Sequence, residues 1–135
     1  MRHFLITVLM IALGAVPALS QPEGDAYEAR IGPDWVQRAE VAAGSYYFRP
    51  GHIIVKAGVP VELELKSEAL IIPHDFIINA PEAGIEVSEE LTRKPVFIRF
   101  TPTKAGKYPF HCGKDFPFQK SHREKGMEGV LEVVP

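Results

Sequence analysis

The sequence has only one cysteine, Cys112, among its 135 residues. A single cysteine cannot form a disulfide bond within the chain, so its thiol is inert, linked to a partner or bound to a metal. The chain also lacks internal repeats, low-complexity tracts and long stretches of helical periodicity. These absences argue against repeat architectures and helical bundles.

No charge of one sign dominates the chain. It contains 15 lysine and arginine residues against 17 aspartate and glutamate residues, for a net charge of −2. A nucleic-acid partner is therefore not expected. The sequence also shows no Ser-His-Asp order, glycine-rich phosphate loop or pair of catalytic acids, so an enzyme is not expected either. The length corresponds to a single domain.

The longest hydrophobic run, residues 4–16, is shorter than the about 20 residues that a membrane-spanning helix needs. Arg2 precedes this run and a small-x-small sequence follows it at residues 18–20, which is the pattern of a secretory signal peptide. We predict that residues 1–20 are a cleaved signal peptide, with a membrane anchor as the alternative. The mature protein is then expected in the periplasm, without a membrane span.

The rest of the chain reads as a short arm followed by strands. Residues 21–35 are polar and contain two glycines and two prolines, so a loose N-terminal arm is expected, with the domain at 36–135. Residues 80–92 show no clear pattern and are expected to hold a helical turn or an irregular crossover. An all-β fold is predicted, a Greek-key β-sandwich of about seven to eight strands. The predicted strands are 36–41, 46–48, 52–56, 61–66, 75–79, 95–100, 106–112 and 129–134.

Residues that commonly bind metals are concentrated between positions 107 and 127. Tyr108, Phe110 and Cys112 alternate with polar or proline residues, which is the period of a half-buried strand. Because neighbouring side chains of a strand point to opposite faces, Cys112 is predicted to point inward and His111 outward. His111 is therefore not expected to bind the same ion as Cys112.

His122 and Met127 follow Cys112 in the next loop. A thiolate, an imidazole and a thioether form most of a soft metal site. Two histidines and a cysteine with a weak axial methionine form the donor set of a mononuclear blue-type copper centre. The second histidine is expected upstream on another strand, and His74 in IIPHDFIIN is well placed to supply it.

Other chemistries fit this group of residues less well. A dinuclear copper centre needs two bridging cysteines, and the sequence has one. A thioether is a poor zinc ligand. A catalytic thiol is not expected on the inward face of a strand. His52, at the start of a different strand, is expected at the surface.

The residues around these candidates resemble the cupredoxin family of single-domain copper proteins. The resemblance covers residues 46–135, with the motifs PHDF, FTPTKAGKYPFHC, SHREKGM and MEGVLEVV. It implies one copper ion that alternates between Cu(I) and Cu(II). Two features differ from plastocyanin and azurin. The interval from Cys112 to His122 is longer, and Asp75 stands where those proteins have asparagine, which changes a hydrogen-bonding group beside the ligands. The ligands implied by the resemblance are His74, Cys112, His122 and Met127.

The resemblance implies a carrier of single electrons between redox partners. The alternative is a protein that sequesters or delivers copper without electron transfer, and a metal-free sandwich that binds a partner is a third possibility. Residues 116–118 are expected to surround the ring edge of His122 at the surface. The protein is expected to be a monomer that docks to the acidic surface of a redox protein. The basic residues expected to attract that surface are Lys114, Lys120, Arg123 and Lys125.

Overall fold

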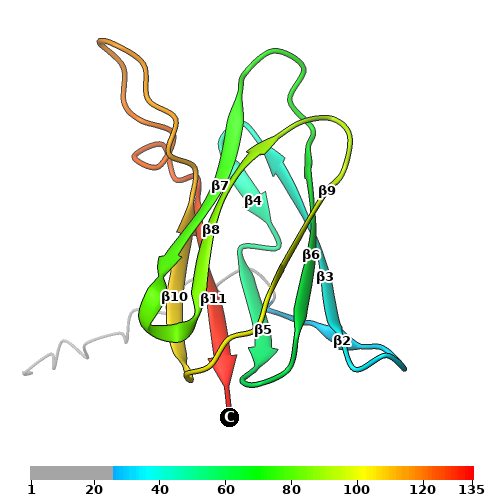
Figure 1. Cartoon of the computed structure of the whole chain (residues 1–135). Coiled ribbons are helices and arrows are strands. Elements are labelled where there is room, and N and C mark those ends of the chain that lie inside the picture. Colours follow the sequence, from blue (N-terminus) through cyan, green and yellow to red (C-terminus); the bar gives the residue numbers. More distant parts are fainter. Residues whose placement is uncertain (1–25) are drawn as a thin grey trace, which may run out of the picture.

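The computed structural model describes residues 26–135, and the predicted signal peptide lies outside them. This part of the chain forms two β-sheets that face each other (Figure 1). One sheet has the strand order β1-β5-β11-β10-β7-β8, and the other has the order β2-β3-β6-β9 with β4 paired to β3. The predicted all-β sandwich is confirmed. Within the described residues, no helix is both long and apolar enough to cross a membrane. The strands are β1 (Tyr27–Glu28), β2 (Arg30–Ile31), β3 (Gln37–Gly44), β4 (Tyr47–Arg49), β5 (His52–Lys56), β6 (Val61–Ser67), β7 (His74–Ala80), β8 (Ile85–Leu91), β9 (Val96–Phe100), β10 (Gly106–His111) and β11 (Glu128–Val134).

Alternation of apolar and polar residues along the strands determines which face of each sheet points to the core. In β6, Val61, Leu63 and Leu65 have no exposed surface, whereas the residues between them point outward. β6 lies in the middle of its sheet and pairs in parallel with β3 and antiparallel with β9. The alternating pattern therefore identifies both the strand and the face that contributes to the core.

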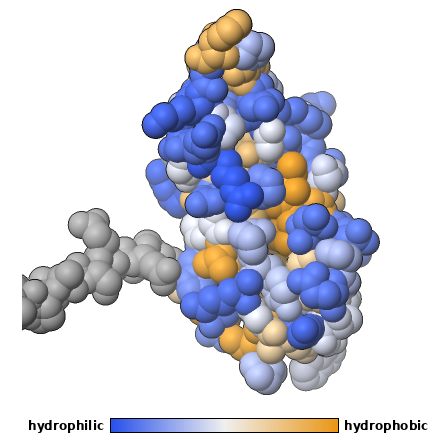
Figure 2. Space-filling view, turned by 90° about the vertical axis from the view of Figure 1, so that its left-hand side faces the viewer, coloured by the Kyte–Doolittle hydropathy of each residue, from blue (hydrophilic) through white to orange (hydrophobic). Residues whose placement is uncertain are grey.

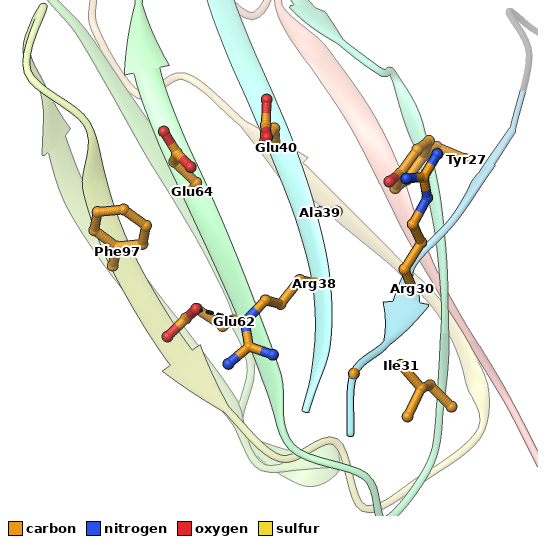
Figure 3. Close-up of a pocket in the computed structure, with 10 residues that line it drawn as sticks. Tyr27, Arg30, Ile31, Arg38, Ala39, Glu40, Glu62, Glu64 and Phe97 are labelled. Carbon is orange, nitrogen blue, oxygen red and sulfur yellow. Dashed lines mark hydrogen bonds and ion pairs between the residues drawn. The ribbon is translucent and has the colours of Figure 1, made fainter. Parts of the chain in front are cut away.

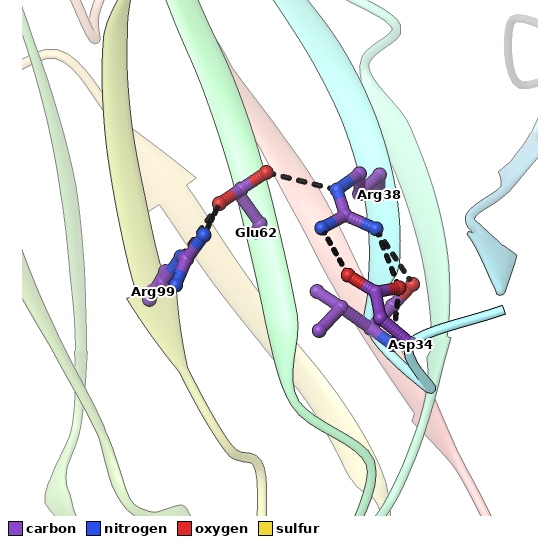
Figure 4. Close-up of polar contacts among 5 residues, drawn as sticks. Asp34, Arg38, Glu62 and Arg99 are labelled. Carbon is purple, nitrogen blue, oxygen red and sulfur yellow. Dashed lines mark hydrogen bonds and ion pairs between the residues drawn. The ribbon is translucent and has the colours of Figure 1, made fainter. Parts of the chain in front are cut away.

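The outward face of the same sheet carries a chain of ion pairs (Figure 4). Arg38 on β3 contacts Asp34 at 2.7 Å and Glu62 of β6 at 2.9 Å, and Glu62 also pairs with Arg99 on β9. The hydrogen bonds from Arg38 and Arg99 lower the pKa of Glu62, because they favour its charged form. These exposed pairs connect three neighbouring strands on the outside of the sheet.

A cluster of three phenylalanines fills the core between the sheets. Phe48 lies edge-on to both Phe76 and Phe110, with ring centroids 5.4 and 5.5 Å apart, and the latter two rings stack at 4.9 Å. Edge-to-face and offset stacked rings are the arrangements that aromatic side chains prefer. Phe76 follows His74 by two residues and Phe110 precedes Cys112 by two, so the cluster supports the same faces of β7 and β10 that carry those residues.

Part of the expected N-terminal arm belongs to the sandwich. Tyr27–Glu28 pairs in parallel with β5, and Arg30–Ile31 pairs antiparallel with β3. Residues 27–31 therefore extend both sheets instead of forming a loose arm. These strands have two residues each, which is too short for an alternating pattern to be seen in the sequence.

The segment 80–92 contains both a helical turn and a strand. Pro81–Ala83 forms a single 3-10 turn, and β8 then pairs with the whole of β7, from His74 opposite Leu91 to Ala80 opposite Ile85. Acidic residues dominate β8, whose sequence is IEVSEEL. They obscured the alternation, so this strand was not predicted. The described residues 26–135 form eleven strands instead of seven or eight.

Candidate metal centre

The four candidate ligands gather at one end of the sandwich. His74 is the first residue of β7, Cys112 directly follows β10, and Met127 directly precedes β11. These strand ends meet at the top of Figure 1, where the loop between β10 and β11 also begins and ends. His74 and Cys112 are far apart in the sequence, and the antiparallel pairing of β7 with β10 brings them together.

Three donor atoms of this group form a compact triangle. His74 Nδ1 and His122 Nδ1 are 3.2 Å apart. Cys112 Sγ lies 3.4 Å from His122 Nδ1 and 3.9 Å from His74 Nδ1. These three residues form the one cluster of histidine, cysteine and acidic side chains with metal-site spacing in the described part of the chain.

The size of the triangle fits a transition-metal ion. With sides of this length, the point equidistant from the three donor atoms lies about 2 Å from each of them. This is close to the 2.0–2.3 Å length of bonds from a metal to imidazole nitrogen and thiolate sulfur. Two nitrogens and one soft sulfur in a plane match the preferences of copper.

All four candidate ligands are withdrawn from solvent. His74, His122 and Met127 have no exposed surface, and Cys112 is 1% exposed. The backbone of Met127 joins the other two loop residues, because its N–H donates to His122 O at 3.0 Å and its carbonyl accepts from Cys112 N–H at 3.1 Å. The backbone of Met127 is therefore tied to two of the three residues of the triangle.

Burial also controls the protonation of the donor atoms. It lowers the pKa of His74 and of His122 and thus favours neutral imidazoles, whose nitrogens can bind a metal. Burial raises the pKa of the Cys112 thiol, against a smaller opposing effect of backbone hydrogen bonds from Asp75 and Lys114. A metal ion must therefore displace the thiol proton when it binds.

Asp75 and Lys114 tie the ligand-bearing segments together. The Asp75 carboxylate accepts a hydrogen bond from Gly113 N–H at 2.6 Å, which links the residue after His74 to the residue after Cys112. The Lys114 carbonyl accepts a hydrogen bond from His122 N–H at 2.9 Å. The substitution of aspartate for asparagine noted in the sequence therefore keeps an acceptor for the backbone next to Cys112.

A capping box fixes the turn that carries His122. Ser121 Oγ accepts a hydrogen bond from Glu124 N–H at 3.2 Å, and the Glu124 carboxylate accepts one from Ser121 N–H at 2.7 Å. The turn ends at Gly126, whose φ of +97° is rarely adopted by residues with a side chain. The S-x-x-E sequence therefore does mark the single turn that positions His122.

Residues of the opposite sheet cover the cluster. Ser45 and Tyr46, in the turn between β3 and β4, contact the two histidines. Ser45 Oγ lies 3.3 Å from His74 Nε2, and the Tyr46 ring centroid lies 4.8 Å from that of His122. The sequence analysis did not identify either residue, because nothing in the local sequence GSYY distinguishes a turn that contacts the metal centre from an ordinary turn between strands.

Two other histidines lie outside the cluster. His111 is half-buried at the end of β10, and Cys112 next to it is almost fully buried, as the strand alternation predicts. His52 on β5 instead contacts Glu132 on β11, with 2.7 Å between His52 Nε2 and the carboxylate. Neither histidine joins the metal-spaced group.

The prediction that His122 lies at the surface is wrong. His122 has no exposed surface, and its ring packs against Phe116, with 5.6 Å between the centroids. Phe116 is 40% exposed and Phe118 is fully exposed. Figure 2 shows a hydrophobic tip at the top of the molecule, the end at which Figure 1 places the β6–β7 and β10–β11 loops. The apolar residues therefore project into solvent beyond His122 instead of framing an open ring edge.

Two of the four expected basic residues form ion pairs with acidic residues from other elements. Lys114 contacts Glu90 of β8 and lies 3.8 Å from Asp75. Arg123 contacts Glu128 at 2.8 Å. These acidic partners lie outside the 104–125 segment and reach it only through the fold.

A surface groove of about 360 Å³ lies on the outer face of β3, β6 and β9 (Figure 3). Its walls include Tyr27, Arg38, Glu64 and Phe97. None of the four candidate metal ligands lines this groove. It is therefore separate from the candidate metal centre.

Comparisons with known proteins agree with this architecture. The sequence profile of the cupredoxin-like domain family matches residues 8–127. No curated protein sequence matches the chain significantly. The metal-binding domain of the Cu(I)-exporting P-type ATPase CopA from Streptococcus pneumoniae D39, in complex with Cu(I), superposes with a TM-score of 0.64 and 20% identity, covering 83% of this chain and 98% of that domain.

Two further solved structures share the fold. Auracyanin A, a blue copper protein from Chloroflexus aurantiacus, has a TM-score of 0.55 and 20% identity, and the alignment covers 73% of this chain and 99% of that protein. The periplasmic domain of cytochrome oxidase subunit II from Bradyrhizobium japonicum has a TM-score of 0.53 and 11% identity, with 72% and 83% covered. At these identities the structural similarity establishes the fold alone.

Proposed function

Because the chain belongs to the cupredoxin-like domain family, we propose that it is a mononuclear copper protein that carries single electrons between redox proteins. The observation that carries this proposal is the buried triangle of two imidazole nitrogens and one sulfur with sides of 3.2, 3.4 and 3.9 Å. A bound copper ion supplies the Cu(II)/Cu(I) couple. His74, Cys112 and His122 would hold the ion, with Met127 as a weak fourth ligand.

The surrounding structure favours electron transfer over chemistry on a substrate. His74 and Cys112 lie at strand ends and His122 lies on a hydrogen-bonded turn, so these ligands need little movement when the charge of the ion changes. Their burial also excludes water from the site. No ligand position is open to a substrate in this arrangement, so a catalytic role is not part of the proposal.

Copper addition to the purified protein tests the proposal directly. One copper ion per chain and an intense thiolate-to-copper absorption band are expected. Cys112→Ser should remove the band, because the thiolate supplies that transition. His74→Ala and His122→Ala should weaken binding or admit outside ligands. An unchanged spectrum in Cys112→Ser would rule out the site. His111→Ala is the matched control and should keep both the band and the stoichiometry.

Copper storage or delivery is the second candidate function. The similarity to a domain whose structure contains Cu(I) favours it, whereas the complete burial of the ligands disfavours transfer of the ion to an acceptor. Rapid electron self-exchange and a reversible potential are expected of the electron carrier. Rapid loss of Cu(I) to a chelator, with slow self-exchange, would instead support copper delivery.

We also propose that the protein works in the periplasm as a mature chain beginning near Gln21. The support is the signal-peptide pattern of residues 1–20. Mass spectrometry of the periplasmic fraction should detect the shortened chain. Recovery of the full-length chain from membranes would instead identify residues 1–20 as an anchor.

A further inference from the structure

The candidate ligands have no surface that a redox partner could touch. His74 and His122 are completely buried, and Cys112 and Met127 are buried with them. The His122 Nε2 atom, on the far side of the ring from the donor triangle, is also buried and lacks a hydrogen-bond partner. An electron exchanged with another protein must therefore cross a side chain that lies between this cluster and solvent.

Tyr46 occupies that intermediate position. Its ring centroid is 4.8 Å from that of His122, at an interplanar angle of 61°, and 6.4 Å from that of His74, at 89°. Tyr46 itself is only half-buried. Among the described residues, no other aromatic side chain contacts both of these histidines; Phe116 contacts His122 alone.

Lys125 holds the Tyr46 ring in place. Lys125 Nζ lies 4.3 Å from the ring centroid and donates a hydrogen bond to Tyr46 Oη at 3.2 Å. An ammonium group over an aromatic face is attracted by the ring electrons. The positive charge also disfavours removal of an electron from the ring.

We propose that Tyr46 is the contact point through which an electron passes between a protein redox partner and the copper centre. This inference rests on the proposed electron-carrier function. One electron leaves the donor protein, which is oxidised, and reduces Cu(II) to Cu(I). The ring of Tyr46 mediates this transfer through its contacts with the two imidazoles. Tyr46 keeps its proton and is neither oxidised nor reduced, and no covalent bond forms or breaks.

The first test measures electron self-exchange between oxidised and reduced copies of the copper-loaded protein. Tyr46→Leu should slow the exchange at least about tenfold, which corresponds to a barrier increase of about 1.4 kcal/mol. The absorption band and the reduction potential should stay close to those of the unmodified protein, because Tyr46 supplies no metal-binding atom. Exchange at the original rate in Tyr46→Leu, with the same spectrum, would overturn the proposal.

Two further variants separate the ring from its surroundings. Tyr46→Phe retains the ring and loses only the hydroxyl group, so its exchange rate should remain within about threefold of the original, a barrier change below 1 kcal/mol. A tenfold loss in Tyr46→Phe would overturn the role of the ring contacts, even if Tyr46→Leu does not fold. Tyr47→Leu is the matched control, because Tyr47 contacts Glu68 and Arg49 and neither histidine.

A second measurement uses the protein after removal of copper. If Tyr46 covers the cluster, a thiol reagent should modify Cys112 slowly in the unmodified protein and faster in Tyr46→Leu, with no change in Tyr47→Leu. Equal rates of Cys112 modification in all three proteins would show that Tyr46 does not shield the cluster from solvent. Two outcomes of the self-exchange measurement separate this proposal from the electron-carrier function. If the unmodified copper protein shows no electron exchange, the electron-carrier function itself is overturned. If only Phe116→Leu slows the exchange, the contact point is Phe116 and only the present proposal is overturned.

Discussion

Met127 is the residue whose replacement most directly tests the proposed copper chemistry. It is completely buried beside Cys112 and His122. Met127→Leu should retain copper but raise the reduction potential, because a thioether donates more electron density to Cu(II) than a hydrocarbon does. Leucine is close in volume, so the core should tolerate the change. Voltammetry measures the potential. An unchanged potential in the loaded variant would show that Met127 packs near the ion without acting on it.

The buried histidines predict how the copper-free protein responds to pH. Burial lowers the pKa of His74 below its ordinary value of 6.5, and the nearby His122 lowers it further. Above pH 6.5 the imidazole is neutral in both the folded and the unfolded chain, so it has no effect on stability. As the pH falls below 6.5, the unfolded chain binds protons that the folded chain binds less well.

The free energy of unfolding of the copper-free protein should therefore decrease as the pH falls from about 6.5, the ordinary histidine pKa. Urea unfolding at a series of pH values measures this. His74→Gln should reduce the slope. A slope that is unaffected by His74→Gln would assign the pH response to other groups.

Residue types and spacing predicted that His74, Cys112 and His122 meet at the site, and the structure brings these three side chains together. The role of Met127 as a fourth ligand stays a prediction. Cys112, His122 and Met127 follow one strand end, and strand alternation separates Cys112 from His111. Tyr46 could not be predicted in the same way, because its contact with both histidines depends on how one sheet lies over the other. The ion pair between Lys114 and Glu90 likewise depends on β8, which its acidic sequence concealed.

At the level of secondary-structure elements, the short turn from Ser121 to Gly126 is the support of His122. Ser121→Ala removes the side-chain acceptor for Glu124 N–H, a change that typically costs about 1 kcal/mol at a helical N-terminus. We expect lower copper affinity, because His122 would be held less firmly. Titration with a copper chelator measures the affinity. Ser88→Ala, on the exposed face of β8, is the matched control. Equal affinities in the two variants would contradict the role of the turn.

The strands show where sequence patterns succeed. β6 alternates three apolar residues with charged ones and was predicted within one residue of its observed end. β1 and β2 were missed because two residues cannot show a period. β4 has three residues, and its position was predicted within one residue because a proline and glycines bracket it. Alternation therefore locates long strands, and turn residues locate short ones.

For the molecule as a whole, the fold weakens the expected basic docking surface. Lys114 and Arg123 contact acidic residues, whereas no carboxylate partner is present for Lys120 in the described part of the chain. The proposed reaction with an acidic redox protein should slow only moderately as salt increases, because fewer free charges attract the partner. Stopped-flow rates at several ionic strengths measure this dependence.

Lys120→Glu should slow the same reaction without changing the copper spectrum. Lys107→Glu makes an identical change in net charge near the start of β10, about 15 Å along the strand from Cys112, and should slow it less. Equal effects of the two variants would show that net charge, and not a basic surface near the site, governs the encounter.

The loop between β10 and β11 is closed at its base by two backbone hydrogen bonds, from His122 N–H to Lys114 O and from Cys112 N–H to Met127 O. Beyond this closure Phe116 still packs against His122, but Phe118 at the tip is fully exposed. The entropy of closing a loop rises only slowly with its length. Insertions, deletions and substitutions at the tip of this loop can therefore accumulate during evolution without changing the arrangement of the metal ligands. Partner choice and redox chemistry can in this way evolve separately within one short stretch of chain.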